Sequence, residues 1–198
     1  MGRNKTAWAT TTALMVATLG VAAVPADATT TTTTSTTAQT TACPTGWGSV
    51  AKTRSAATTE SLTDVRTGRH ACFDRMVVDV PGAGTSGLGY TVRYVSRLYQ
   101  DGSGHHVPVG GGAVLEVRVA APAYDPDTGQ PTYPVRAGER LKGVNLTGYR
   151  TFRDARFVGS FEGDTQIGLG VRARLPFRVW VATDRVVIDV AHNWTGAR

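Results

Sequence analysis

Alternation of apolar and polar residues is the dominant pattern of the chain beyond residue 43. One segment alternates Ala113, Leu115, Val117 and Val119 with Val114, Glu116 and Arg118. The same period of two recurs at 92–98, 157–161, 167–174 and 177–181. Successive side chains of a β-strand point to opposite faces, so each segment predicts a strand with one buried face.

A heptapeptide occurs twice, as Asp74-Arg75-Met76-Val77-Val78-Asp79-Val80 and as Asp184-Arg185-Val186-Val187-Ile188-Asp189-Val190. Both copies alternate, which predicts two strands whose Val78 and Ile188 side chains point into one shared core. Asp74 and Asp184 start the two strands and should accept hydrogen bonds from an arginine or from backbone N–H groups. The repeat therefore favours a role in the scaffold over a role in a reaction.

Turn residues separate the predicted strands, and they lie at 81–89, 101–102, 110–112, 127–129 and 162–164. No segment sustains a helical period, except a short stretch at 59–66. Many short strands with regular turn signals are typical of a β-sandwich or barrel. The predicted fold is all-β, a β-sandwich or open barrel of about seven or more strands.

The N-terminus has the three parts of a secretion signal. Arg3 and Lys5 precede the apolar run 13–24, and Ala26-Asp27-Ala28 supplies the small residues of a cleavage site. The apolar run is shorter than the ~20 residues that cross a bilayer. We therefore expect a signal peptide at 1–28, export, and no membrane insertion after cleavage.

Residues 29–42 are almost entirely threonine, with a little serine, alanine and glutamine. Such side chains bury too little apolar area to offset the entropy cost of ordering the chain. This segment is expected to be a flexible linker, and residues 43–198 are long enough for one domain with a core.

The chain has two cysteines, Cys43 and Cys72, and both follow the predicted signal peptide. Two thiols in an oxidising compartment usually pair, and no further metal-ligating residues lie near them. The sequence therefore predicts a Cys43–Cys72 disulfide.

The net charge is +6, from 21 Lys and Arg against 15 Asp and Glu. The basic residues are scattered between apolar ones and form no block, which disfavours nucleic acid as a partner. A surface of this kind suits an anionic wall polymer or exposed carboxylates better.

Several longer motifs resemble those of the AMIN-like domain of secreted bacterial proteins. They are Trp47-Gly48-Ser49, the stretches 66–75, 90–95, 121–125, 148–152, 159–163 and 168–179, and the closing Val187-Ile188-Asp189-Val190-Ala191-His192. The resemblance covers essentially all of residues 43–198. It implies a β-sandwich related to the amidase N-terminal domain, a non-catalytic module that targets proteins to the cell envelope and is thought to bind peptidoglycan.

Four residues near the C-terminus form the predicted ligand-binding face: Arg172, Arg174, Arg178 and Trp180. If the strand runs on through Leu175-Pro176, all four leave the same or adjoining surface. Arginine pairs with carboxylates and phosphates, and an exposed tryptophan offers a flat face to a sugar ring. The alternative is a solvated strand face with Trp180 packed under a loop or in a second core layer.

Other candidate chemistry is weakly supported. His105-His106, His70 and His192 lack the spacing of a zinc site, and Asp125-Pro126-Asp127 lacks the ligands of a calcium loop and fits a turn instead. Paired carboxylates such as Glu162 and Asp164 could serve a glycosidase, but alternating acids beside a glycine turn are common without catalysis. No metal site, cofactor or catalytic residue is therefore predicted.

Functions of two classes, binding and hydrolysis, remain open. The favoured one is a secreted, non-enzymatic module, extracellular or retained at the cell wall, that binds peptidoglycan or another wall polymer. The alternatives are a small exported hydrolase acting on wall glycan or peptide, and a secreted protein-recognition domain. The sequence leaves the ligand and the oligomeric state undetermined.

Overall fold

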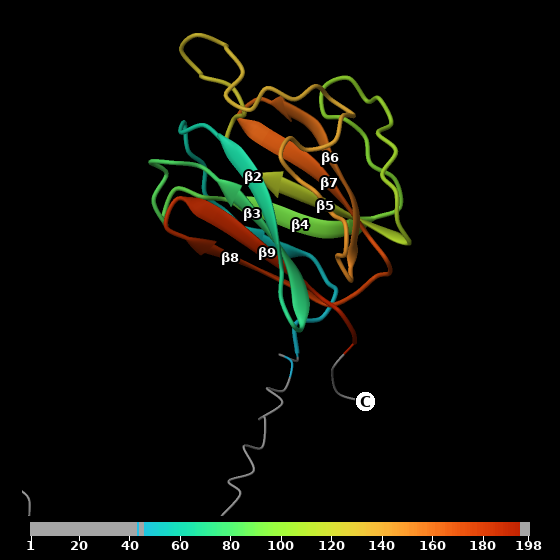
Figure 1. The fold of residues 1–198 in the computed structure, drawn as a ribbon. Helices are drawn as coiled ribbons and strands as arrows, with labels where there is room; N and C mark the ends of the chain where they lie inside the picture. Colours follow the sequence, from blue (N-terminus) through green and yellow to red (C-terminus); the bar gives the residue numbers. More distant parts are fainter. Residues whose placement is uncertain (1–42, 44–45, 195–198) are drawn as a thin grey trace, which may run out of the picture. The chain divides into compact units, whose positions relative to one another are not determined.

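The computed structural model describes residue 43 and residues 46–194, so the predicted signal peptide and linker lie outside the described residues. The described part is all-β and contains nine strands (Figure 1). These are β1 (Lys52–Arg54), β2 (Asp64–Arg69), β3 (Phe73–Asp79), β4 (Tyr90–Val95), β5 (Ala113–Val119), β6 (Phe152–Phe161), β7 (Asp164–Val171), β8 (Phe177–Ala182) and β9 (Arg185–Ala191).

The strands form two antiparallel sheets that face each other, as Figure 1 shows, which confirms the sandwich prediction. One sheet has five strands in the order β1-β4-β5-β7-β6, and the other has four in the order β2-β3-β9-β8. β7 and β8 are consecutive in sequence but belong to different sheets. The residues between them cross from one layer of the sandwich to the other.

One apolar core fills the space between the sheets. The four-stranded sheet contributes Val65, Met76, Val78, Val186, Ile188, Val190 and Phe177, and the five-stranded sheet contributes Val92, Leu115, Val117, Ile167, Leu169 and Phe152. All of these side chains are at most 1% exposed. The alternation read along the sequence therefore identifies the inner face correctly on both sheets.

The repeated heptapeptides are β3 and β9, and the two copies pair directly with each other. Met76 lies opposite Ile188, Val77 opposite Val187, and Val78 opposite Val186. The fourth position of one copy thus faces the fourth position of the other, which gives the pair an approximate twofold relation. Val78 and Ile188 are both fully buried in the shared core, as predicted.

Asp74 and Asp184 both accept backbone N–H groups, as predicted, but in different surroundings. Asp74 is fully buried and its Oδ2 accepts from Thr151 N (2.6 Å) and Phe152 N (3.2 Å). Asp184 stands in the β8–β9 turn at φ 58°, where its Oδ1 accepts from Gly84 N (2.7 Å). Each carboxylate ties a distant loop to the four-stranded sheet.

Three sequence-based boundaries were wrong. The stretch at 59–66, which has a short helical period, forms no helix. Its last residues belong to β2, where Val65 is buried between exposed residues and pairs with Val78. The strand at 92–98 ends at Val95, and Leu98 packs against Val107 and Val158 in a separate small cluster. The strand at 167–174 ends at Val171, where the chain leaves the sheet.

The β4–β5 connection lies over the outer face of the five-stranded sheet. Gly168 and Gly170 of β7 point to this face, and neither position has room for a side chain. A Cβ at Gly168 would lie 2.5 Å from Leu98, and a Cβ at Gly170 would lie 1.8 Å from the carbonyl oxygen of Gly110. The glycines allow the loop to pack directly on the sheet.

The predicted disulfide between Cys43 and Cys72 is present, with a Cα–Cα distance of 5.3 Å. It joins the N-terminal end of the described chain to the residue before β3. Within residues 46–194, no helix has the length and apolarity needed to cross a membrane.

Candidate functional site

The outer face of the four-stranded sheet carries a group of charged and aromatic side chains that we call the arginine–aromatic cluster. Its members are Trp47, Phe73, Arg75, Arg178, Trp180 and Asp189. β-Sheet pairing sets Arg75 opposite Asp189 and Asp189 opposite Arg178. Three neighbouring strands thus place one guanidinium group on each side of the Asp189 carboxylate.

Asp189 is the centre of this arrangement. Arg75 binds it through two hydrogen bonds, from Nε to Oδ1 (2.7 Å) and from Nη2 to Oδ2 (2.9 Å). Arg178 binds Oδ2 through Nε (3.0 Å) and Nη2 (2.9 Å). The Asp189 side chain is fully buried, whereas those of Arg75 and Arg178 are 27% and 40% exposed. The hydrogen bond to Asp189 raises the pKa of Arg75, with the charge of Asp189 adding to the effect.

Aromatic rings surround the two guanidinium groups. Arg178 lies 4.4 Å from the centre of the Trp47 ring and 4.7 Å from that of Trp180. Arg75 lies 4.9 Å from the Trp180 ring centre and 5.1 Å from that of Phe73. Each such cation–π contact contributes about 0.5 to 1 kcal/mol at a partly exposed site. Together they hold the rings and guanidinium groups in fixed positions on a half-buried surface.

The N-terminal segment supplies Trp47 to the cluster. The Gly48 carbonyl accepts a hydrogen bond from Phe177 N (2.9 Å), so the segment runs beside the start of β8. Trp47 also contacts Phe73, with ring centres 5.7 Å apart. The Cys43–Cys72 disulfide lies four residues before Trp47 and one before Phe73, and it fixes this segment to the β3 side of the sheet.

The structure brings together two of the four predicted binding residues. Arg178 and Trp180 share the cluster, since both lie on the outer side of β8. The assumption of one continuous strand was wrong, so Arg172 and Arg174 lie on the connection between the sheets. Arg172 donates to the carbonyl of His192, and Arg174 packs on the Tyr94 ring and donates to the Ser49 carbonyl (3.3 Å).

Sequence reasoning missed Trp47, Phe73, Arg75 and Asp189 as members of the same surface. A signal for two of them was present in the repeat. Pairing the two copies about their fourth position places Arg75 opposite Asp189. Trp47 carried no such signal, because its position depends on the disulfide and on the path of an irregular segment.

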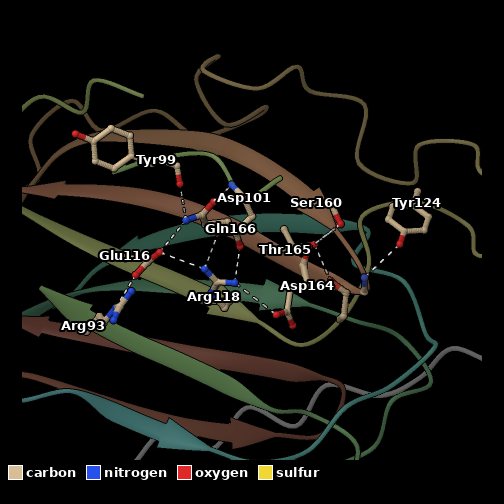
Figure 2. Close-up of polar contacts among 12 residues, drawn as sticks. Arg93, Tyr99, Asp101, Glu116, Arg118, Tyr124, Ser160, Asp164, Thr165 and Gln166 are labelled. Atoms are coloured by element: carbon tan, nitrogen blue, oxygen red, sulfur yellow. Dashed lines mark hydrogen bonds and ion pairs between the residues drawn. The ribbon is translucent and has the colours of Figure 1, made fainter. Parts of the chain in front are cut away.

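The outer face of the five-stranded sheet carries a different polar network (Figure 2). Glu116, which is 3% exposed, accepts from Arg93 Nε (2.7 Å) and from Gln166 Nε2 (2.7 Å). Arg118 binds Asp101 and lies 3.6 Å from Asp164. Burial acts to raise the pKa of Glu116, but the hydrogen bonds and charges of its partners outweigh burial and lower the pKa. These polar groups satisfy one another.

The residues considered for catalysis or metal binding do not form a reaction centre among the described residues. Glu162 occupies a turn at φ 49°, and Asp164 lies beside Arg118. Asp125 holds a turn by accepting from Asp127 N and Thr128 N (both 2.9 Å), as predicted. In the described part of the chain, no three His, Cys, Asp or Glu side chains form a metal-binding group.

A buried histidine–aspartate pair escaped the sequence analysis. His192 Nε2 donates to Asp74 Oδ1 (3.1 Å), and both residues are at most 3% exposed. The opposite ring nitrogen, Nδ1, is buried and has no hydrogen-bond partner. A nucleophilic triad needs a hydroxyl or thiol bonded to that free nitrogen. The pair instead connects β3 to the residue that follows β9.

Comparison with known proteins gives one match. No curated protein and no solved structure matches this chain. The family model described as AMIN-like domain matches residues 60–192, which include eight of the nine described strands and all of the arginine–aromatic cluster except Trp47. The match spans more than half of the sequence, and the chain therefore belongs to the AMIN-like domain family.

Proposed function

We propose that this protein is a secreted module that binds peptidoglycan or another cell-wall polymer through the arginine–aromatic cluster, without cleaving it. Membership of the AMIN-like family indicates a cell-envelope-associated module. The observation that carries the finer proposal is the alternation of aromatic rings and guanidinium groups around Asp189. Arg172 and Arg174 lie on the connection that leads into β8 and are not members of the cluster.

The chemistry of the cluster matches that of a wall glycan. Sugar rings present C–H faces that pack on the flat faces of tryptophan, and wall polymers carry carboxylate or phosphate groups that arginine binds. Asp189 neutralises only part of the charge of Arg75 and Arg178, and both guanidinium groups keep exposed area. A preformed cluster loses little conformational entropy when the ligand arrives.

Three carboxylates of the domain are set up for structural rather than acid–base roles. A glycosidase needs an acid whose pKa is raised so that it can protonate the leaving group. At Glu116 and Asp154, hydrogen bonds and arginine charges instead outweigh burial and lower the pKa. Backbone hydrogen bonds from Thr128 and Asp127 lower the pKa of Asp125. These three groups are therefore suited to remain ionised and to hold the structure together.

Location follows from the same proposal. The signal peptide at 1–28 would export the chain, and the Thr-rich segment at 29–42 would carry the domain at 43–198 away from its point of exit. The disulfide fits an envelope or secreted protein, since such bonds persist in oxidising compartments. An intact mass corresponding to a mature chain that begins at Thr29 tests the cleavage site.

Wall co-sedimentation tests the function. The exported protein is incubated with insoluble bacterial cell wall, the pellet is assayed for protein, and the supernatant is assayed for released sugar and peptide. The variant Arg178→Ala with Trp180→Ala should lose binding, because a tryptophan at the centre of a binding surface contributes about 1 to 3 kcal/mol. Raising the salt concentration should weaken the wild type, because it screens arginine contacts.

The control is the double variant Arg97→Ala with Tyr99→Ala. It also removes one arginine and one aromatic ring, but from the β4–β5 connection over the five-stranded sheet. Circular dichroism and thermal unfolding confirm that each variant is folded. Equal wall binding by a folded Arg178→Ala, Trp180→Ala protein and by the wild type would rule out the cluster as the site. Release of sugar or peptide by the wild type would instead support the hydrolase alternative.

A further inference from the structure

A concave site lies beside the arginine–aromatic cluster, where four distant segments meet. Its lining includes Arg69 and His70 at the end of β2, Asp74 of β3, Gly148 and Arg150 of the loop before β6, and His192 after β9. His70 stacks on Phe73 of the cluster, with ring centres 4.5 Å apart. The concave site and the cluster are therefore adjoining parts of one surface.

Two guanidinium groups in this site have no internal partner. Within residues 46–194, the exposed side chains of Arg69 and Arg150 form no ion pair and donate no hydrogen bond. A Cβ built at Gly148 would lie 2.8 Å from Arg69 Nη1, so the Arg69 head group packs against the Gly148 backbone. The other arginines that line concave surfaces each form an ion pair, as where Arg156 binds Asp154 (2.8 Å), or donate to a backbone carbonyl, as where Arg54 binds Leu88 (2.6 Å).

The base of the site contains the buried pair of His192 and Asp74. Asp74 is the only carboxylate in the lining, and it is already bound by His192 and by the N–H groups of Thr151 and Phe152. His192 is 3% exposed and its buried Nδ1 has no hydrogen-bond partner among the described residues. Because Nε2 donates to Asp74, Nδ1 of the neutral ring is an acceptor, and a water or a hydroxyl between it and a bound group would recover the free energy that an unpartnered buried atom costs.

We propose that this site binds an oxyanion, a carboxylate or phosphate group, between Arg69 and Arg150 and above His192. Asp74 acts as the positioning residue: it holds the His192 ring and the loop that carries Arg150. Paired arginines bind planar and tetrahedral oxyanions through several charge-assisted hydrogen bonds. The inference rests on the proposed function only for the source of the anion, which would be a charged group of the wall polymer whose sugars contact the cluster.

The loop that carries Arg150 is held firmly enough to shape such a site. Tyr149 donates from its hydroxyl to Thr67 Oγ1 of β2 (2.9 Å) and stacks on Phe152. Arg153 donates to the backbone carbonyls of Tyr149 (3.0 Å) and Arg150 (3.1 Å). The backbone at residue 150 is thus fixed to the sheet, while the Arg150 side chain stays available.

The test is an NMR titration of the exported chain with inorganic phosphate and, separately, with acetate, at constant ionic strength. We expect saturable shifts of the His192 and His70 imidazole signals with at least one of these anions. Arg69→Gln with Arg150→Gln should weaken that binding about tenfold or more, because it removes both charge-assisted contacts. His192→Gln can still donate to Asp74 but loses the Nδ1 acceptor, which would reach the anion only through a bridging water, and it should weaken binding by a smaller factor.

The matched control is Arg97→Gln with Arg136→Gln, which removes two other exposed arginines that form no ion pair among the described residues. This control should bind the anions as the wild type does. Absence of a saturable shift with both anions, or an unchanged affinity in the folded Arg69→Gln, Arg150→Gln variant, would overturn the proposal.

The same variants separate this inference from the proposed function. If the Arg178→Ala, Trp180→Ala variant retains both anion binding and wall binding, that result supports the oxyanion site and contradicts the proposal that the cluster binds the wall. The source of the anion is resolved with two wall preparations, one stripped of phosphodiester polymers and one with its peptide carboxylates amidated. If the Arg69→Gln, Arg150→Gln variant binds intact wall more weakly than the wild type but binds one treated wall equally well, the group removed from that wall is the ligand. If the variant binds intact wall as the wild type does, a wall anion is refuted as the ligand.

Discussion

The two ends of the β3–β9 strand pair have the same chemistry in sequence but different surroundings. The repeat places an arginine of one copy opposite an aspartate of the other at each end: Arg75 opposite Asp189, and Arg185 opposite Asp79. At the first end the carboxylate is fully buried and bound closely by two arginines. At the second end Asp79 is 18% exposed, binds Arg66 closely (2.6 Å), and lies 3.6 Å from Arg185.

The difference arises from residues outside the repeat. Trp47, Phe73 and Trp180 pack around Arg75 and Arg178, and no aromatic ring of the described residues stacks on Arg185 or Arg66. The disulfide and the N-terminal segment lie at the Asp189 end only. A symmetric strand pair therefore carries an asymmetric surface. We expect function at the Asp189 end, where residues outside the repeat add aromatic rings.

The largest expected effect on stability comes from removing the Cys43–Cys72 disulfide, which lies at the Asp189 end of the strand pair. Replacing both cysteines, Cys43→Ala with Cys72→Ala, should lower the free energy of unfolding by about 3 to 4 kcal/mol, the chain-entropy value for a loop of this length. It should also weaken wall binding, because Trp47 is no longer fixed beside Arg178. Urea unfolding and wall co-sedimentation measure the two effects, and a double variant as stable as the wild type would contradict the role of the disulfide.

The two aspartates give the next comparison. Asp189→Asn should destabilise the protein by about 2 to 3 kcal/mol, because it removes the charge that holds two half-buried arginines around a buried site. Asp79→Asn, the same change at the matching position, should cost less than about 1 kcal/mol, since Arg66 is 49% exposed. Urea unfolding of both variants is the measurement. Equal losses would show that the two ends are energetically alike.

The stability of the protein should depend on pH through the polar network around Glu116 on the five-stranded sheet. The pKa of Glu116 is lowered in the folded protein from its ordinary value of 4.5. Its contribution to stability is therefore present above that value and is lost as the pH falls through the folded pKa. Glu116→Gln should cost about 1 kcal/mol at neutral pH, and the difference from wild type should shrink as the pH falls below 4.5, the ordinary pKa of a glutamate. A difference that stays constant with pH would contradict this account.

The fold was largely predictable because the signal is periodic. Alternation identified the inner faces of β5 and of both repeat copies, since a sheet with one buried face imposes a period of two on its sequence. The same reasoning failed at Leu98, whose side chain alternates correctly but packs on the outer face under the β4–β5 connection. Local pattern carries no information on which loop covers which face.

The candidate site was predictable only in part, for a related reason. Arg178 and Trp180 are two residues apart on one strand, so the strand period alone places them together. Arg172 was grouped with them by assuming a continuous strand, and the crossing between the sheets separates it. Trp47 and His192 reach their positions through a disulfide and a buried hydrogen bond, which depend on tertiary contacts.

Two matching arginines of the repeat test the central claim most directly, namely that the Asp189 end of the strand pair binds the wall. Arg75→Gln and Arg185→Gln make the same change at equivalent positions, and both proteins are compared with wild type in saturation binding to insoluble wall. Arg75→Gln should weaken binding about threefold to fivefold, or about 0.6 to 1 kcal/mol, because it removes one of the two guanidinium charges that the cluster offers to the wall. Arg185→Gln should bind as the wild type does. Equal affinities for the two folded variants, or a larger loss with Arg185→Gln, would contradict the account.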